Sequence, residues 1–352
     1  MTGVWLSIAP LKKNSRASIH VMARTGRTGR APAALFQFGS AFRIGLTMKI
    51  GISITSAHDL SNIGDVRTGA RWMIERAAAA RQAGLDSLFI GDHHVTGTPY
   101  YQNTPMLGRL LAEWGDADVG ALYILPLWQP VLLAEQVATL ASIAEGRFIM
   151  QCGLGRGEDQ FSAMGRDIRF RPSAFEECLN SLRQLWRGET VSSNGRNKFG
   201  PATIAPLPPE PIDVWIGANA TVAIERAARM GDAWLAEPSL NIEQARAAFN
   251  TYRQARELLG LPIPETVAIR RDIHVAEHPN EADLIRQQVN QTGYRGFSTD
   301  ALIIGDPDQM AAEFRQLQEI GYTDVIVRSL HPYQGHTIAS LQRLSRVKAQ
   351  LE

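Results

Sequence analysis

Short apolar runs alternate with longer amphipathic segments along the chain from residue 48 onwards. The apolar runs are rich in β-branched residues and have the length of buried strands, whereas the segments between them repeat apolar positions at helical spacing. Strict alternation of this kind predicts parallel strands joined by crossover helices. Strands are expected at 49–54, 87–91, 118–125, 147–152, 213–217, 233–236, 267–275 and 324–328, and helices at about 67–83, 105–114, 130–144, 173–187, 219–230, 241–259, 279–291, 307–320 and 337–350.

Eight strands, each followed by a helix, predict an α/β fold, a (β/α)8 or TIM barrel with insertion loops. No linker divides the sequence after residue 47, so residues 48–352 are expected to form this barrel as one domain. Residues 190–211 are rich in Gly, Pro and Asn, and residues 292–306 are polar and contain glycine. Together with residues 96–104, these two segments are expected to be the loops that select the substrate.

The first 47 residues differ from the rest in composition. They carry seven basic side chains and no acidic one. Subtracting these seven from the 36 basic residues of the chain leaves 29 against 35 acidic ones, a formal charge of −6. An Arg-rich, acid-free leader resembles a transit peptide. Because a strand opens directly at Met48, the simpler interpretation is that residues 1–47 precede the native start or are disordered.

Charge and cysteine content narrow the classes of function. A mildly acidic domain lacks the clustered positive face that nucleic acid requires, so no nucleic-acid partner is expected. No apolar run is long enough to cross a bilayer, and no membrane partner is expected either. Cys152 and Cys178 are too few for a disulfide framework, which favours a reducing, cytoplasmic setting.

The segment Asp92-His93-His94 places titratable groups where the strand 87–91 ends. In parallel α/β proteins, active sites form at the carboxyl ends of strands. Neighbouring residues point to opposite sides of a strand, so one histidine is expected to face the barrel mouth and the other a helix or neighbouring strand. This spacing does not suit a metal pair, which uses alternate strand positions or i, i+4 on a helix. The alternative is a partly buried histidine that only stabilises a loop.

Two further strand ends have the features of an anion site. In Gly153-Leu154-Gly155-Arg156, glycines allow the backbone to approach a ligand closely and to offer its amide groups. No helix follows at once, so a dinucleotide-binding Rossmann site is not indicated. The segment Gly217-Ala218-Asn219-Ala220-Thr221 leads from a strand directly into a helix, whose free amides stabilise phosphate. An ordinary glycine turn and plain helix capping explain the same residues equally well.

Aromatic and imidazole side chains near other strand ends are candidates for contact with a small-molecule substrate. They are His58, Tyr100, Tyr101, Trp128 and His331. The alternative for the aromatic residues is packing at a subunit contact. Small residues in the strand 118–125 fit a bulge beneath a flat ligand, and an ordinary core strand explains them as well.

Taken in order, several segments resemble the bacterial-luciferase-like flavin- and F420-dependent oxidoreductases. The segments are 83–94, 130–136, 146–148, 153–155, 227–234 and 304–307, and they cover nearly all of 48–330. The resemblance implies a (β/α)8 barrel, usually a homodimer, whose mouth holds reduced FMN or the deazaflavin F420.

The resemblance also assigns residues by position. His93 corresponds to the family's catalytic histidine, and Leu122 and Tyr123 fall where relatives carry a non-prolyl cis peptide behind the cofactor ring. The cofactor phosphate is expected between two sets of residues, which are Gly153, Leu154 and Gly155 on one side and Gly217, Ala218, Asn219 and Thr221 on the other. Leu154 aligns with a phosphate-binding arginine of luciferase itself, so Arg156 is expected to substitute for that arginine. Arg156 also falls where some F420 dehydrogenases carry a glutamate acid, which disfavours the branch that oxidises sugar phosphates.

The function that the resemblance implies is that of a flavin-dependent monooxygenase using reduced FMN and O2 on a small organic substrate. His93 would stabilise the oxygenated flavin or exchange a proton with it. Because no nicotinamide-binding fingerprint is present, a separate flavin reductase is the expected partner.

Three alternatives remain open. The first is an F420-dependent hydride transferase on the same scaffold, with His93 as the proton donor or acceptor. The second is a metal-dependent hydrolase with ligands such as His58, Asp92, His93 and His331, although the usual pair of histidines on the first strand is missing. The third is a non-catalytic subunit like the luciferase β chain.

Overall fold

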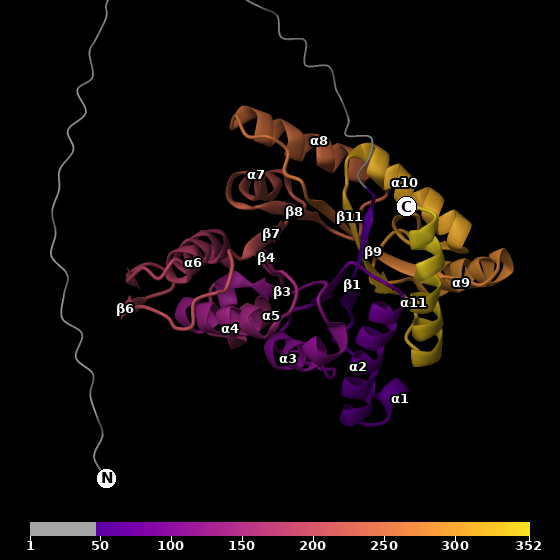
Figure 1. Cartoon of the computed structure of the whole chain (residues 1–352), viewed down its shortest axis with the longest axis horizontal. Helices are drawn as coiled ribbons and strands as arrows, with labels where there is room; N and C mark the ends of the chain where they lie inside the picture. Colours follow the sequence, from indigo (N-terminus) through magenta and orange to yellow (C-terminus); the bar gives the residue numbers. More distant parts are fainter. Residues whose placement is uncertain (1–46) are drawn as a thin grey trace, which may run out of the picture. The chain divides into compact units, whose positions relative to one another are not determined.

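The computed structural model describes residues 47–352 (Figure 1). The basic leader therefore lies outside the described residues, apart from Thr47. Its nature and the domain boundary beside it stay predictions.

Eight parallel strands form a closed ring. In ring order they are β1 (Lys49–Ile54), β2 (Ser87–Ile90), β3 (Asp118–Ile124), β4 (Phe148–Gly153), β7 (Asp213–Gly217), β8 (Ala233–Ala236), β9 (Val267–Val275) and β11 (Asp324–Ser329). β11 pairs with β1, which closes the ring. β8 and β9 pair through only three residues of each strand, whereas β9 and β11 pair through six. The predicted α/β, TIM-barrel fold is confirmed, as is each of its eight strands.

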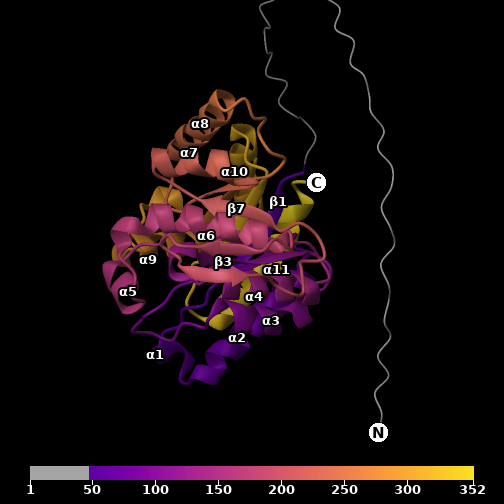
Figure 2. The same cartoon turned by 90° about the vertical axis from the view of Figure 1, so that its left-hand side faces the viewer.

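Nine helices of ten or more residues surround these strands within residues 47–352 (Figures 1 and 2). They are α2 (Val66–Gln82), α3 (Asn103–Trp114), α4 (Pro130–Ile143), α6 (Arg171–Trp186), α7 (Thr221–Met230), α8 (Ile242–Leu258), α9 (Pro279–Thr292), α10 (Pro307–Ile320) and α11 (Gln334–Ala349). All nine lie where the apolar spacing predicts them, within a few residues at each end. At α10, the Asp306 side chain caps the Gln309 N–H at 2.9 Å and Pro307 occupies the first turn, both favourable at a helix start.

The segment 190–211 contains an antiparallel hairpin, β5 (Val191–Ser193) and β6 (Phe199–Ala202), that the sequence did not predict. Glu177 of α6 holds the hairpin, since its carboxylate accepts hydrogen bonds from the Arg196 and Asn197 N–H groups at 2.7 and 2.9 Å. The hairpin therefore lies along the outer side of α6 (Figure 1). The expected role as a substrate-covering loop is wrong for this segment, because a connection from a helix to the next strand starts at the amino ends of the barrel strands.

The segment 292–306 is only partly a loop. Its second half forms a 3-10 turn, Thr299–Ala301, and the short strand β10 (Ile303–Gly305). β10 pairs with the last three residues of β9, beyond the point where the pairing of β9 with β8 ends. The first half of the segment, around Arg295, reaches the barrel mouth as expected of a covering loop. Two short helices, α1 (Leu60–Ile63) and α5 (Glu158–Ala163), were also not predicted.

Side chains that point into the barrel form an apolar plug. They are Phe89, Ile149, Trp215, Ala233, Leu235, Ala268 and Ile326, all buried. Gly120 belongs to the same interior, and a Cβ there would lie 1.8 Å from the Ile149 carbonyl oxygen, so only glycine lets β3 and β4 approach this closely. β3 and β4 pair without interruption from Val119 to Ile124, so β3 is an ordinary core strand without the considered bulge. Beyond the plug, toward the carboxyl ends, the inward positions become polar and open into a cavity.

Candidate functional site

A cavity of about 700 Å³ opens at the carboxyl ends of the strands. It is lined by residues 53–57 at the end of β1 and just beyond it, by 91–93 and Tyr100 after β2, and by Leu122 and Ile124 of β3. Gly153 at the end of β4, Gly155, Arg156 and Gln160 after it, and the side chains of Arg270, Arg295 and Arg328 complete the lining. A second cavity of about 420 Å³ adjoins the first, because six residues line both: Leu122, Gly153, Gly155, Arg156, Arg270 and Arg295. The two cavities therefore form one continuous mouth, which is where a parallel barrel places its active site.

His93 and His94 point to opposite sides of the strand end. His93 is exposed to the larger cavity, and its ring stands edge-on to Tyr100 with centroids 5.8 Å apart. His94 lines neither cavity, and its Nε2 lies 3.2 Å from the Asp92 Oδ1. The Asp92 carboxylate raises the pKa of His94. The expected alternation is thus present, whereas the catalytic role of His93 stays a prediction.

Asp92 ties neighbouring strand ends together. Its side chain is completely buried, and Oδ2 accepts hydrogen bonds from the Ile124 N–H and from the Trp128 indole, both at 2.8 Å. With His94 at its other oxygen, the carboxylate joins the end of β2 to the end of β3 and to the loop that follows. Because both oxygens face protein groups, Asp92 positions the strand end that carries His93.

The smaller cavity brings together the two segments expected to hold a phosphate. Gly153, Leu154 and Gly155 line it from β4, and Gly217, Ala218 and Asn219 line it from β7. α7 begins here with Ala220 as an N-cap that offers no capping side chain, so its first amides are free to bind an anion. Thr221 is exposed and lines neither cavity, which does not support the contact expected of its side chain.

Two charged residues line the smaller cavity beside these amides. Arg156 lines both cavities, and its exposed guanidinium has no partner among residues 47–352, so it is free to reach a ligand phosphate. Glu237 also lines the smaller cavity and accepts hydrogen bonds from Asn219 and Ser239. This carboxylate was not anticipated from the sequence, and it orients the Asn219 amide.

The side chains of Leu122 and Tyr123 point in opposite directions at the end of β3. Leu122 points inward and lines both cavities. Tyr123 points outward, is fully buried, and packs edge-on against Trp128 with ring centroids 5.3 Å apart. Among residues 47–352 the only cis peptide bond joins Ala205 and Pro206, so the bond between Leu122 and Tyr123 is trans, unlike that implied by the resemblance. The alternation of strand side chains therefore removes Tyr123 from direct cofactor contact.

Of the five side chains expected to touch the substrate, only Tyr100 lines the mouth. His58 is buried between Trp72 and Tyr101, with ring centroids 6.1 and 5.7 Å away, and burial lowers its pKa to about 4. The Tyr101 hydroxyl donates to the Val66 carbonyl of α2. Both side chains turn back onto the helix that follows β1, so direct substrate contact is not supported for them.

The remaining two are also directed away from the mouth. Trp128 donates its indole N–H to Asp92, and His331 stacks on His336 at 4.1 Å beyond the end of β11. Within residues 47–352, no group of three His, Cys, Asp or Glu side chains is placed to hold a metal ion. His58, Asp92, His93 and His331 are thus not assembled as the ligands that a metal-dependent hydrolase would need.

Sequence reasoning missed three arginines at the mouth: Arg270 of β9, Arg328 of β11 and Arg295 of the covering segment. A signal was present, because Arg270 and Asp272 stand at alternate positions of a strand that is buried along almost its whole length. Charges spaced in this way on a buried strand point into the barrel.

The chain belongs to the luciferase-like monooxygenase family, whose model matches residues 48–294. It is therefore an enzyme of the luciferase-like oxidoreductases, a family that includes FMN-dependent and F420-dependent members. The resemblance drawn from the sequence is confirmed. No helix among residues 47–352 is long and apolar enough to cross a membrane.

Curated relatives are similar at low identity. An F420-dependent glucose-6-phosphate dehydrogenase from Kribbella flavida is 23% identical over 301 residues, which span 74% of this chain and 88% of the relative. A protein of the same name from Beutenbergia cavernae is 30% identical over 176 residues, but that match spans only 47% of this chain and 52% of the relative.

Solved structures share the fold. The oxygenating constituent of 3,6-diketocamphane monooxygenase from Pseudomonas putida, in complex with FMN, has a TM-score of 0.72 at 18% identity and covers 86% of this chain and 98% of its own. An F420-dependent secondary alcohol dehydrogenase with an F420–acetone adduct has a TM-score of 0.68 at 15% identity, covering 86% and 99%.

Proposed function

We propose that this chain is an F420-dependent oxidoreductase that transfers a hydride between the coenzyme and a small organic substrate. The observation that carries the proposal is the position of His93, the only imidazole that lines the mouth cavity within the described residues. Curated relatives similar in sequence are F420-dependent dehydrogenases, which supports F420 over FMN.

The residues of the mouth suit a flat ring with an anionic tail. The free amides of α7, the glycine turn after β4 and the Arg156 guanidinium would hold the phosphate. Leu122 offers an apolar surface where the two cavities meet, which suits the ring. The bound deazaflavin would supply the hydride donor or acceptor.

His93 would hold or release the proton that accompanies the hydride. A substrate alcohol must lose its hydroxyl proton when its carbon is oxidised, and an imidazole open to the cavity can take that proton. Tyr100 packs against the His93 imidazole and limits the rotation of that imidazole. Burial raises the pKa of Tyr100 to about 12, so its phenol stays neutral and does not compete as a base.

The substrate of the curated relatives is not carried over. Arg156 stands where the resemblance places the glutamate acid of F420 dehydrogenases, and an arginine cannot donate or accept protons near neutral pH. We propose that the chain acts on a different substrate, and that it forms a homodimer as its family commonly does.

The second candidate is the FMN-dependent monooxygenase, with a separate reductase to supply reduced flavin. It is favoured by the description of the family model and by an FMN complex of similar fold. In this case Arg156 would replace the phosphate-binding arginine of luciferase itself, because Leu154 stands at that position.

Fluorescence titration of the purified full chain with F420 and, separately, with FMN tests the proposal. We expect saturable quenching with F420 at micromolar concentrations and weaker binding of FMN. F420 reduction is then followed with a panel of alcohols, comparing wild type with His93→Ala and with the exposed control His278→Ala. Binding of FMN alone would overturn the proposal in favour of the monooxygenase, and binding of neither coenzyme would overturn both.

A further inference from the structure

Three guanidinium groups converge on the larger cavity from distant parts of the chain. Arg270 and Arg328 point inward from the paired strands β9 and β11, and Arg295 enters from the segment after α9. Arg270 donates a hydrogen bond to the Ser53 hydroxyl at 3.1 Å, and Arg328 donates one to the Thr55 hydroxyl at 3.3 Å. Neither of these two arginines forms an ion pair with a residue of 47–352, and the Arg270 Nε is buried without any partner.

The acidic groups nearby do not balance these charges. Asp272 is completely buried beside them, but its Oδ2 pairs with Arg295 at 2.6 Å. Asp92 at the other wall is already engaged by Ile124, Trp128 and His94. Burial raises the pKa values of Tyr100 and Tyr294 to about 12, so neither phenol supplies a negative charge. Three guanidinium groups therefore face the single negative charge of Asp272, whose Oδ1 is buried without a hydrogen-bond partner, so positive charge is in excess at this wall.

An unpaired charge inside a protein is costly unless a partner arrives with the ligand. Burial and the neighbouring Arg328 lower the pKa of Arg270 to about 10, so the guanidinium is still protonated at neutral pH. The arrangement thus resembles a receptor for an anion, with the Ser53 and Thr55 hydroxyls as further donors.

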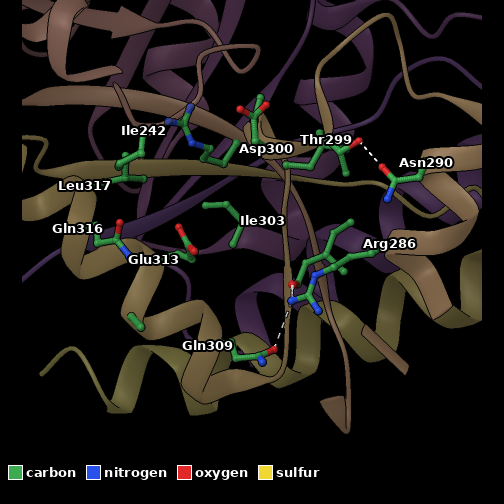
Figure 3. Close-up of a pocket in the computed structure, with 15 residues that line it drawn as sticks. Ile242, Arg286, Asn290, Thr299, Asp300, Ile303, Gln309, Glu313, Gln316 and Leu317 are labelled. Carbon is green, nitrogen blue, oxygen red and sulfur yellow. Dashed lines mark hydrogen bonds between the residues drawn. The ribbon is translucent and has the colours of Figure 1, made fainter. Parts of the chain in front are cut away.

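A second arginine-lined cavity lies outside the barrel, and its arginines are accompanied by as many acidic residues, unlike those of the mouth. Its volume is about 620 Å³, and it lies against α9, α10 and β10 (Figure 3). Arg271 and Arg286 line it together with the carboxylates Asp300 and Glu313, so positive and negative groups are present in equal number. Arg271 follows Arg270 directly but faces this outer cavity, which makes it a matched control.

The ring order separates Arg328 from the wall proposed to bind the coenzyme phosphate, whereas Arg270 and Arg295 also line the smaller cavity. In the ring of eight, β11 stands three strands from β7 and four from β4, and β1 stands three from β4 and four from β7, so both lie across the barrel from that wall. An anion held by Arg328 and the β1 hydroxyls is therefore distinct from the coenzyme phosphate at α7.

We propose that Arg270 and Arg328 form a subsite for an anionic group of the substrate, such as a phosphate, sulfonate or carboxylate. Arg295 forms the ion pair with Asp272, so the charges of the other two arginines exceed the negative charge that the protein places beside them. The inference rests on the proposed function insofar as it assigns the anion to the substrate of the same mouth.

Calorimetric titration of the full chain with inorganic phosphate, sulfate and acetate tests the subsite directly, each against chloride at the same ionic strength. We expect saturable binding of at least one of these anions. Arg270→Gln and Arg328→Gln should weaken it about tenfold or more, since a charge-assisted contact is lost. Arg271→Gln should change it by less than about twofold, and lysine at 270 or 328 should restore part of the affinity because the charge remains. The melting temperature of each variant shows whether it folds. If a glutamine variant does not fold, the lysine variant at the same position is measured in its place.

Fluorescence titration with F420 on the same variants separates substrate from coenzyme. If Arg270→Gln and Arg328→Gln weaken F420 as much as they weaken the anions, these arginines hold the coenzyme and the proposal is overturned. The absence of saturable anion binding to wild type also overturns it. If wild type binds the anions through these arginines but binds neither coenzyme, the subsite stands and the proposed function fails.

Turnover identifies the kind of anion. Pairs of alcohols that differ only in a phosphate ester, sulfonate or carboxylate group are compared in F420 reduction. The charged member of a pair should react, with Arg270→Gln raising KM more than it lowers kcat. Equal turnover of charged and neutral members would contradict the proposal.

Discussion

Replacing Asp92 tests how the strand end that carries His93 is held in place. Asp92→Ala removes the acceptor of two hydrogen bonds, from the Ile124 N–H and the Trp128 indole, at a site where the side chain is completely buried. A hydrogen bond to a charged group contributes roughly 1.5–3 kcal/mol, so losing both should cost about 3–6 kcal/mol of the free energy of unfolding. That is a large share of the stability of a typical domain.

Asp92→Asn is the matched control for this loss. The asparagine has the same shape and keeps one oxygen where Oδ2 accepts both hydrogen bonds, so we expect it to cost about 1 kcal/mol. Urea denaturation of the full chain, followed by circular dichroism, measures both variants against wild type. A loss below about 1 kcal/mol in Asp92→Ala, or equal losses in the two variants, would refute the assignment of Asp92 as the anchor.

Three further predictions follow from the same structure. His93→Ala should lower turnover by about a hundredfold or more with an unchanged melting temperature, since its ring faces the cavity and leaves the fold untouched; unchanged turnover would remove it from the mechanism. Asp92 raises the pKa of His94 above its usual 6.5, so this pair should stabilise the fold fully below pH 6.5 and lose that contribution as the pH rises through the higher folded value; comparing unfolding midpoints of wild type and His94→Gln across this range checks the sign, and a parallel pH dependence of the two would contradict it. Gly120→Ala should abolish folding or leave the protein insoluble, because the added Cβ would lie 1.8 Å from a β4 carbonyl, whereas Gly200→Ala meets no atom within 4 Å and should be tolerated; expression and melting temperature compare the two, and similar stabilities would argue against the close approach of β3 and β4.

The fold was predictable because its main elements are long and strongly patterned. Strands buried on both faces read as apolar runs, and the helices between them repeat apolar positions over three turns or more. The hairpin was not predictable, since β6 is Phe-Gly-Pro-Ala and has no strand pattern. β10 is only three residues long, and it pairs because β9 extends beyond β8.

The site could be predicted only where the alternation of side chains along a strand determines which way a residue points. The alternation of side chains predicts one histidine at the mouth and the other behind it, the resemblance selects His93, and the structure places His93 at the cavity and His94 away from it. His58 lies in the connection after β1 and Tyr101 in the connection after β2, and both side chains turn toward α2 at positions that no strand pattern reaches. Arg270 and Arg328 come together only because β9 and β11 pair in the closed barrel, and no local sequence pattern predicts that pairing.

The short pairings of β8 make it the strand at which this cylinder opens most readily. β8 pairs with β7 and with β9 through three residues each, compared with six between β9 and β11, so fewer cross-strand bonds must break. Brief local separation at β8 should appear as faster amide hydrogen exchange in β8 than in β3, which pairs with β2 through four residues and with β4 through six. Since Leu235 and Ala236 of β8 also line the smaller cavity, such opening would widen an entry route beside the first amides of α7.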